Sequence, residues 1–428
     1  MITQLVDVSD VCNSSARELQ RLASNGEWDV SSTAESKIHK IHSYPAKFPA
    51  FLASQALEYA RSQGVDPKRV ADIFCGCGTV AYEARLNDAD FWGCDINPVA
   101  TLIASVKSGF YDPDLFIRYH NLILKNFDIM DADANFSLRR TNRLLYWFRV
   151  EQFKNLAQLR NSINFSIPED SCYRNAFLCA FSAILKKTSQ WRQRSTKPQY
   201  DQEKQPKSVL EAFTKQCKYM ANAWRSCKPT GSSSCEIIND SIIDVSTPAE
   251  LVDIIITSPP YVTSYDYADL HQLSSLWLGY AEDYRELRNG SIGSAVNTVD
   301  LRKEVKNLNR TAYQIVFSLY DKDPLAAKSA ARYYLDMQKV AKRCYSFIRP
   351  GGLAFFVIGN TQQNGVQLDN AAHLIESLMK SGFKKVLAAK RTISNKLHTP
   401  YRDDIGRFSQ KKLSKIVYSE EYILIAHR

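Results

Sequence analysis

Short apolar runs alternate with longer stretches of helical periodicity along this chain. Seven of these runs are rich in β-branched and aromatic residues and are bounded by turn residues, which predicts strands. Helical spacing of apolar residues accounts for most of the remainder. Because strands separated by helices usually pair in parallel, the pattern predicts an α/β fold with a doubly wound, mostly parallel seven-stranded sheet and helical insertions. The predicted strands lie at about 69–74, 91–95, 234–238, 252–257, 353–358, 384–390 and 421–426.

Two long segments interrupt this alternation. The segment between the second and third strands has apolar residues near helical spacing, which predicts a helical subdomain. A second insertion, 262–330, begins where the fourth strand ends, so we expect it to line the site that this strand carries. The helical stripes consist of Leu144, Leu145, Phe148, Phe153, Leu156, Leu159, Phe177, Leu178, Phe181, Ile184 and Leu185. We therefore divide the chain into a first part of the core at 36–110, a helical insertion at 111–233 and a second part of the core at 234–428.

Composition supports a folded chain with more than one structural unit. The sequence has 428 residues, of which 45% are hydrophobic, and this exceeds the usual size of a single domain. No apolar run reaches the length of a membrane span, and the first ten residues hold two aspartates and no basic cluster. We expect no membrane association, a cytoplasmic location and reduced thiols at all ten cysteines.

Cysteines and histidines raise metal binding as an alternative. Cys217, Cys227 and Cys235 are widely spaced, and the chain has no C-x-x-C pair. His39 and His42 precede a proline in a predicted loop, where a polar loop role is the simpler interpretation. Because structural zinc sites use paired ligands at short spacing, the sequence predicts no metal.

A glycine turn follows the first predicted strand. Gly76 and Gly78 let the backbone approach a ligand without a Cβ clash, and the next helix directs its N-terminal amides at the same place. Asp95 closes the second strand, where a carboxylate suits two ribose hydroxyls. Ala81 stands where a dinucleotide fingerprint has its third glycine, so a cofactor with a ribose but no pyrophosphate fits best.

The fourth strand ends in the sequence Thr257-Ser258-Pro259-Pro260-Tyr261. Two prolines cannot donate to a sheet ladder, so the strand must stop there and turn its carbonyls outward. The Ser258 hydroxyl and the Pro259 carbonyl could then accept hydrogen bonds from an exocyclic amine, and the Tyr261 ring offers a face for stacking a base. The plain alternative is an ordinary strand that ends at prolines.

A third motif completes a resemblance. The segment His39-Lys40-Ile41-His42-Ser43-Tyr44-Pro45-Ala46-Lys47-Phe48-Pro49 looks like a cofactor-clasping motif, and together the three motifs resemble the S-adenosylmethionine-dependent amino methyltransferases, within them the DNA enzymes that modify cytosine N4 or adenine N6. A turn at 349–352 and a closing strand near 421 fit the same Rossmann-like methyltransferase fold. The resemblance implies S-adenosyl-L-methionine as cofactor and a base flipped out of double-stranded DNA as substrate. It leaves open whether the partner is a restriction endonuclease, another defence component or none.

The resemblance also implies roles for individual residues. Ser258, Pro259, Pro260 and Tyr261 would be catalytic. For the cofactor, it assigns Asp95 to the ribose, Asp72 to the methionine amino group, Asp240 to the adenine end, and Lys47 with Phe48 to the methionine side. The full cofactor set is Tyr44, Pro45, Ala46, Lys47, Phe48, Asp72, Phe74, Gly76, Gly78, Thr79, Asp95, Ile96 and Asp240. Cys77 departs from the family, which usually has serine or threonine there.

Within the resemblance, the residue at position 258 indicates which base is the substrate. Family members with a serine at the position of Ser258 mostly act on cytosine N4, which favours that substrate, although a hydroxyl can accept from the adenine amine as well. An RNA base methyltransferase is a further alternative, which the clasping motif disfavours. A DNA-binding module with a decayed cofactor site is the non-enzymatic alternative, and the intact motifs speak against it.

Positive charge concentrates in one stretch, 186–228, which holds eleven basic and three acidic residues. Interleaved aromatic residues give it the mixture expected where a phosphate backbone is gripped; they are Trp191, Tyr200, Phe213, Tyr219 and Trp224. The residues predicted to contact DNA are Lys186, Lys187, Arg192, Arg194 and Lys197. A solvated helical face is the alternative. A second basic region, 384–428, is predicted to flank the same groove.

Overall fold

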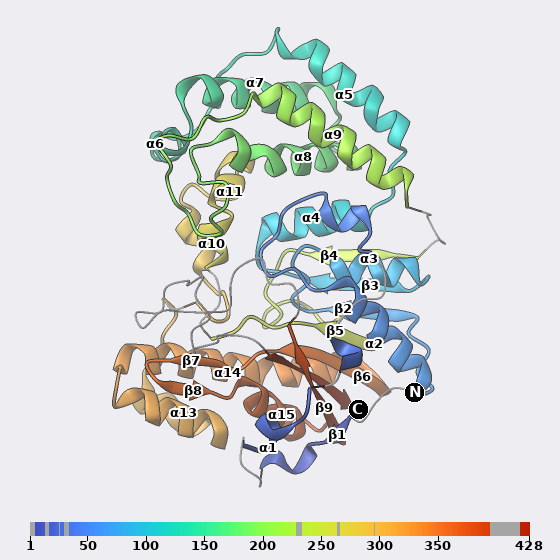
Figure 1. The fold of residues 1–428 in the computed structure, drawn as a ribbon, viewed down its shortest axis with the longest axis vertical. Coiled ribbons are helices and arrows are strands. Elements are labelled where there is room, and N and C mark those ends of the chain that lie inside the picture. The colour runs from blue at the N-terminus through green and yellow to red at the C-terminus, as the bar shows by residue number, and fades with distance from the viewer. Residues whose placement is uncertain are drawn as a thin grey trace.

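The computed structural model describes residues 5–12, 17–24, 26–29, 34–227, 233–262, 266–294, 296–393 and 420–428. Within them, one large sheet forms the centre of the molecule (Figure 1). Its strands are β1 (Val6–Asp7), β2 (Arg69–Asp72), β3 (Asp90–Cys94), β4 (Cys235–Ile238), β5 (Val252–Thr257), β6 (Ile348–Ile358), β9 (Lys385–Thr392) and β10 (Glu420–His427). A separate hairpin pairs β7 (Thr361–Gln363) with β8 (Val366–Leu368).

The sheet is mostly parallel, as predicted. Its spatial order is β1-β9-β10-β6-β5-β2-β3-β4, and the strands from β6 to β4 all pair in parallel. β10 lies between β6 and β9 and runs antiparallel to both. All seven predicted strands are present. The pattern missed β1, which adds to the edge beside β9, because two residues are too few to show a period.

Helices occupy most of the remaining chain. Several begin with the residue types that satisfy free backbone amides: Asp112 precedes Pro113 at the start of α5, and Asp323 precedes Pro324 at the start of α14. The helices are α1 (Arg17–Arg21), α2 (Ala50–Ser62), α3 (Thr79–Leu86), α4 (Pro98–Ser108), α5 (Pro113–Phe127), α6 (Leu138–Trp147), α7 (Val150–Ser166), α8 (Cys172–Thr188), α9 (Val209–Arg225), α10 (Tyr267–Leu270), α11 (Gln272–Leu278), α12 (Leu301–Glu304), α13 (Arg310–Tyr320), α14 (Pro324–Phe347) and α15 (Asn370–Lys380). None of the described helices is long and apolar enough to cross a bilayer.

Each face of the sheet is covered by its own set of helices. Successive strand residues point to opposite faces, so Ile254 packs with α2 and α3 while Ile255 packs with α14 and α15. Phe355 and Phe356 on β6 divide between the same two cores. The sheet is therefore buried on both sides, as parallel sheets require.

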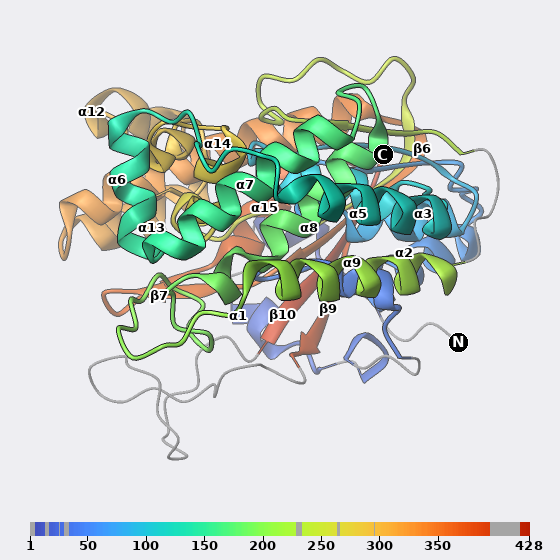
Figure 2. The same cartoon turned by 90° about the horizontal axis from the view of Figure 1, so that it is seen from above.

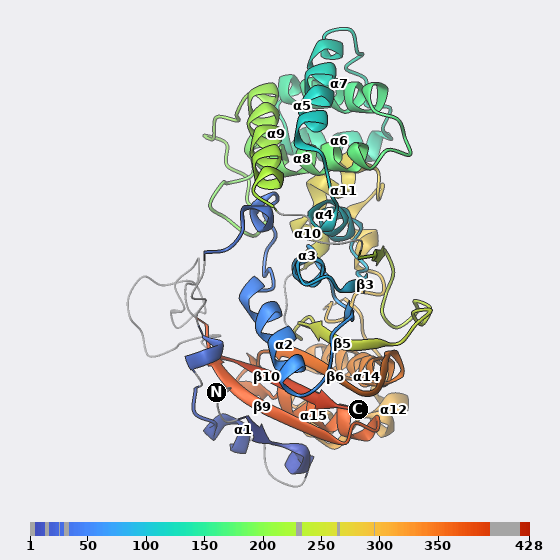
Figure 3. The same cartoon turned by 90° about the vertical axis from the view of Figure 1, so that its right-hand side faces the viewer.

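The helices α5 to α9 gather at one end of the molecule, above the sheet in Figures 1 and 3. They share one apolar cluster with α4 and α11. In Figure 2, α8 runs beside α9, and these two helices pack on each other. Most of the predicted stripe residues are buried in this cluster, for example Leu156 and Phe181, whereas Leu145 is exposed. The division of the chain into three parts stays a prediction.

Candidate active site

The predicted functional motifs meet at the carboxyl edge of the sheet. Asp72 ends β2 and Thr257 ends the neighbouring strand β5, and the Thr257 hydroxyl donates a hydrogen bond of 2.6 Å to Asp72 Oδ1. Asp95 directly follows β3 on the other side of β2. All of these strands run parallel, so their ends open into one place, where ligands of doubly wound sheets bind. A cleft of about 2760 Å³ occupies it.

The glycine turn is bound to Asp95. The Gly76 amide donates to Asp95 Oδ2 at 2.8 Å, and the Asn97 amide donates to Oδ1 at 2.9 Å. Gly76 adopts φ +48° and lines the cleft, as predicted for close approach of a ligand. A carboxylate oxygen can accept two hydrogen bonds, so each oxygen of Asp95 keeps acceptor capacity for one hydroxyl of a ligand.

Gly78 packs against a neighbouring helix. Its φ is +73°, and a Cβ at this position would lie 2.6 Å from Cα of Ala104 on α4. Gly78 is not among the residues that line the cleft. The missing side chain makes room for α4, and the predicted role of Gly78 in ligand approach stays a prediction.

Burial perturbs both carboxylates at this edge. Removal from water raises the pKa of Asp72 to about 7, against the hydrogen bonds from Thr257 and the Phe74 amide. It likewise raises the pKa of Asp95 to about 6. Charge at these two buried positions costs free energy, so a ligand that donates hydrogen bonds or carries positive charge is favoured there.

The clasping segment lies across the glycine turn. A Cβ at Gly76 would touch the Tyr44 ring at 3.5 Å, and that ring stacks on His271 with 5.0 Å between centroids. Lys47 Nζ donates to Glu35 Oε1 at 2.5 Å and to the His39 carbonyl at 3.2 Å, so its ammonium holds the segment in place. Pro45, Ala46 and Phe48 complete this wall of the cleft.

His39 and His42 are more than polar loop residues. His39 is buried and shares a hydrogen bond of 2.8 Å with Glu83 of α3. His42 Nε2 lies 2.9 Å from the Ser182 hydroxyl of α8. The histidines therefore join the clasping segment to two helices, and burial lowers the pKa of His42 to about 4.

At the predicted catalytic corner, two side chains have defined partners. The Ser258 hydroxyl donates to the Val357 carbonyl of β6 at 2.9 Å. The Tyr261 hydroxyl donates to Glu421 Oε1 of β10 at 3.1 Å. All four residues of the corner, Ser258, Pro259, Pro260 and Tyr261, line the cleft. The structure thus brings the corner and the glycine turn into one cavity.

The other predicted cofactor residues also border this cavity. Asp240 follows β4, and its carboxylate accepts from the Ser241 amide at 2.7 Å. The remaining lining residues among those predicted are Phe74, Thr79 and Ile96. Of the second insertion, Asp266, Tyr267 and His271 line the cleft, whereas Trp277 is buried in the helical cluster. Tyr265 of the same insertion lies outside the described residues.

The basic stretch begins at the end of α8 and continues as a loop on the far side of the cleft. Arg194 and Lys197 are exposed, and Arg192 is half exposed beside Asp201, with 3.4 Å between Nε and Oδ2. Lys186 Nζ instead donates to the Ser195 carbonyl at 2.7 Å. Burial lowers the pKa of Lys186 and of Lys187, so these two lysines belong to the base of the loop.

The aromatic residues of this stretch mostly serve the fold. Trp191, Phe213 and Trp224 are buried, and Trp191 stacks on Trp147 with 5.2 Å between ring centroids. The expectation that these rings and the cations form one contact surface is wrong for these three, because their apolar area fills the helical core. Tyr200 remains exposed. In the second basic region, Lys396, Arg402, Arg407, Lys411, Lys412 and Lys415 lie outside the described residues, as does Lys228 of the first.

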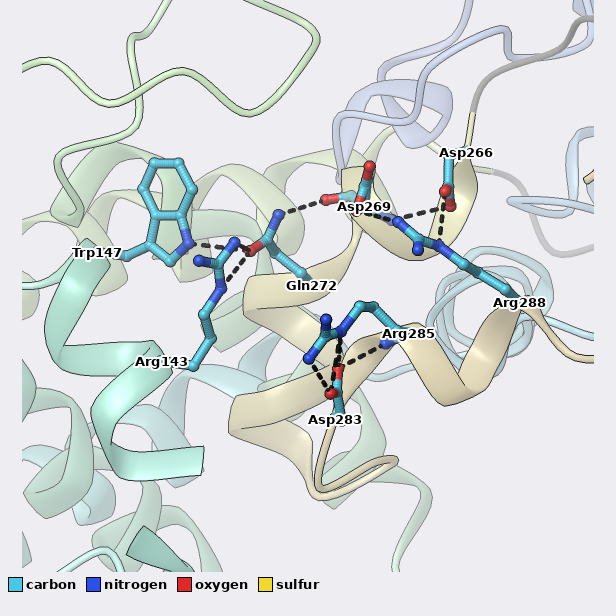
Figure 4. A network of polar contacts seen from close by, with 8 residues as sticks. All are labelled: Arg143, Trp147, Asp266, Asp269, Gln272, Asp283, Arg285 and Arg288. Carbon is cyan, nitrogen blue, oxygen red and sulfur yellow. Dashed lines mark hydrogen bonds and ion pairs between the residues drawn. The ribbon is translucent and has the colours of Figure 1, made fainter. Parts of the chain in front are cut away.

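A network of hydrogen bonds and ion pairs, here called the polar joint, connects α6 of the helical cluster to the insertion 262–330 (Figure 4). Gln272 Oε1 accepts from Trp147 Nε1 at 2.9 Å and from Arg143 at 2.7 Å. Gln272 Nε2 donates to the Asp269 carbonyl at 2.9 Å. Arg288 then pairs with Asp269 at 2.9 Å and with Asp266 at 2.7 Å, so the joint reaches the cleft lining.

Metal binding finds no support in the described part of the chain. No group of three or more His, Cys, Asp or Glu side chains there could hold an ion. The nine cysteines with described side chains are all free thiols, and Cys75, Cys77 and Cys94 are buried at the glycine turn.

Comparison with known proteins agrees with this geometry. The chain is 24% identical to the type II methyltransferase M.MvaI of Kocuria varians over 411 residues, which span 89% of this chain and 90% of that protein. The similarity is to a methyltransferase. Two structures of the rRNA methyltransferase AviRa from Streptomyces viridochromogenes align at 11% and 12% identity, over 82% and 92% of this chain and 94% and 90% of theirs. Their TM-score of 0.27 carries no structural argument. No protein-family model matches the chain.

Methyltransferases of this type use S-adenosylmethionine, and the cleft fits that cofactor. Asp95 has the acceptor capacity for ribose hydroxyls, and the buried Asp72 suits an ammonium group. Gly76 keeps the backbone beside them free of a side chain. The mostly parallel sheet with helices on both faces is also the methyltransferase arrangement.

Three residues at the corner were missed as site residues by sequence reasoning. Glu421 and Arg391 come from the last two strands, and Gly359 directly follows β6. No spacing signal links them to Tyr261, because they lie 98 to 160 residues further along the chain. Arg391 lies within the second basic region, 384–428, which the sequence predicts to flank the groove.

Proposed function

We propose that this protein is a DNA methyltransferase that transfers a methyl group from S-adenosylmethionine to the exocyclic N4 amine of a flipped cytosine. The Ser258 hydroxyl carries this proposal. Its proton is engaged by the Val357 carbonyl at 2.9 Å, so toward the cleft it presents only lone pairs. A group in that position selects a donor, such as an exocyclic amine.

Positioning supplies most of the catalysis in such a reaction. When bound, the cofactor supplies an electrophilic methyl carbon attached to a positively charged sulfur. Ser258 and the Pro259 carbonyl hold the amine through its two N–H groups, which favours a pyramidal nitrogen with a free lone pair. Tyr261 stacks the base and fixes its plane. Because Thr257 bonds to Asp72, this corner stays in register with the cofactor strand.

DNA as substrate is supported by the relative and by the charge on the far side of the cleft. A type II methyltransferase aligns over nearly the whole chain. Arg192, Arg194 and Lys197 line the same cleft as Tyr261 and would contact phosphates beside the flipped nucleotide. Pairing with a restriction endonuclease stays a prediction of the resemblance.

Cytosine is preferred to adenine because of the serine at position 258. The adenine N6 amine is the second candidate, since it can donate to the same acceptors. The candidates are separated by measuring transfer of labelled methyl groups to DNA and to RNA, with reactions that lack the protein as controls. The modified nucleoside is then identified by mass. N4-methylcytosine is the expected product. N6-methyladenine would correct the base, methylated RNA would correct the substrate, and cofactor binding without any transfer would favour a non-enzymatic protein.

A further inference from the structure

The Tyr261 ring is held by parts of the chain that sequence reasoning did not connect to it. Its hydroxyl donates to Glu421 Oε1 on β10 at 3.1 Å. Its edge lies against Gly359, where an added Cβ would meet the ring at 3.0 Å and the hydroxyl oxygen at 3.4 Å. Two contacts at different points of one ring fix its tilt as well as its position.

The Glu421 carboxylate has a second partner, Arg391. Its second carboxylate oxygen, Oε2, accepts from Arg391 NH1 at 3.2 Å. Glu421 and Arg391 are directly opposite each other on β10 and β9, so the pair is built into the sheet register. Arg391 is buried, and its guanidinium lies 5.6 Å from the Phe51 ring centroid of α2. The carboxylate therefore has one oxygen for each neighbour.

The hydrogen bond at this ring survives across the neutral pH range. Burial and the Glu421 carboxylate raise the pKa of Tyr261 well above its ordinary value. The phenol therefore stays protonated and remains a donor to Glu421 Oε1. A phenylalanine could stack a base equally well, which gives the hydroxyl an orienting role.

We propose that Glu421, supported by Arg391, and Gly359 are positioning residues that set the plane of the Tyr261 ring for methyl transfer. This inference rests on the proposed function. In-line transfer needs the amine aligned with the departing sulfur, and the stacked ring defines the plane in which the amine lies. A misplacement of about 1 Å is enough to cost on the order of 100-fold in rate.

The test compares substitutions at Glu421 in two backgrounds. Glu421→Leu removes the acceptor, Glu421→Gln keeps an acceptor of the same shape, and Glu420→Gln is the matched control one residue earlier on β10. Glu420 pairs with Lys390 at 2.8 Å rather than with Tyr261. Each variant is also made with Tyr261→Phe, and kcat, KM for DNA, cofactor Kd and melting temperature are measured.

We expect Glu421→Leu to lower kcat about tenfold or more, with cofactor Kd unchanged within about twofold. Glu421→Gln should retain most of the rate, and Glu420→Gln should match the unsubstituted protein. In the Tyr261→Phe background, Glu421→Leu should have no further effect, because the hydroxyl through which it acts is gone. Equal losses in both backgrounds, or no loss in either, would overturn the inference.

Gly359→Ala provides a second route if Glu421→Leu fails to fold. It leaves the ion pair intact and pushes only on the ring. A fall in kcat of about tenfold at an unchanged melting temperature is expected, whereas an unchanged kcat contradicts the inference. If the unsubstituted protein transfers no methyl group to DNA, the proposed function fails, and this outcome is distinct from transfer that is indifferent to Glu421 and Gly359.

Discussion

The two walls of the cleft are built in opposite ways. At the predicted catalytic corner, each side-chain hydroxyl has a partner on another strand, and the edge of the Tyr261 ring lies against Gly359. On the basic loop that follows α8, Arg194 and Lys197 are exposed, whereas Arg192 pairs with Asp201 and Lys186 donates to the Ser195 carbonyl. Chemistry needs a fixed geometry, whereas phosphate contacts need charge that can adapt. The following predictions separate these two requirements.

Tyr261→Ala should have the largest effect. Loss of base stacking, worth about 1–3 kcal/mol, predicts a fall in kcat/KM of up to roughly 100-fold. DNA affinity, measured separately by fluorescence anisotropy, should change little because the substitution leaves the basic loop unchanged. The activity of Tyr261→Ala is compared with that of Tyr267→Ala, which removes another aromatic ring from the cleft lining. Equal activity of Tyr261→Ala and the unsubstituted protein would remove the corner from the mechanism.

Reversal of charge at Arg192 and Arg194 should have the converse effect. The dependence of log affinity on log salt should become shallower by about 2, since each phosphate contact contributes about 0.9 to the slope. Binding should weaken by roughly tenfold at moderate salt, while kcat at saturating DNA is preserved. Charge reversal at Lys154 on α7, which does not line the cleft, is the control. An unaltered salt slope would show that the loop contacts no phosphates.

The joint between the two walls can be broken at Gln272. Gln272→Leu leaves the Trp147 and Arg143 donors without this acceptor, and we expect a loss of about 1–3 kcal/mol in the free energy of unfolding. Gln272→Glu keeps the acceptor and should lose less. Urea unfolding measures both. Equal stability of the two variants would mean that the hydrogen bonds at this joint contribute nothing net.

Acid should weaken cofactor binding at the glycine turn. Asp95 accepts hydrogen bonds best as a carboxylate, and its pKa is raised to about 6 by burial. Protonation of Asp95 therefore competes with binding as the pH falls through 6 and should by itself raise Kd about fourfold between pH 7.5 and 5.5, and Asp72, whose pKa is about 7, should raise it further. Calorimetry at the two pH values measures this. Asp95→Asn should bind weakly and lose the fourfold contribution of Asp95, so that only the dependence due to Asp72 remains. An undiminished pH dependence in Asp95→Asn would assign the titration to other groups.

Local signals in the sequence explain why the corner and the turn were predicted. The strand before Ser258, the prolines after it and the glycines before α3 each show in a few consecutive residues. What short-range signals do not show depends on partners elsewhere. Gly78 packs against Ala104 on α4, and Trp191 stacks on Trp147 of α6. The Tyr261–Glu421 contact is set by a sheet register across 160 residues.

The position of β10 in the sheet has a consequence for folding during synthesis. Of all the strands in the sheet, β10 is translated last, yet its place is between β6 and β9, which are made earlier. A nascent chain that has emerged as far as β9 must keep that slot open. Glu421 arrives only with the strand that fills it. The contact between the Tyr261 hydroxyl and Glu421 can therefore form only after β10 has been synthesised and inserted between β6 and β9.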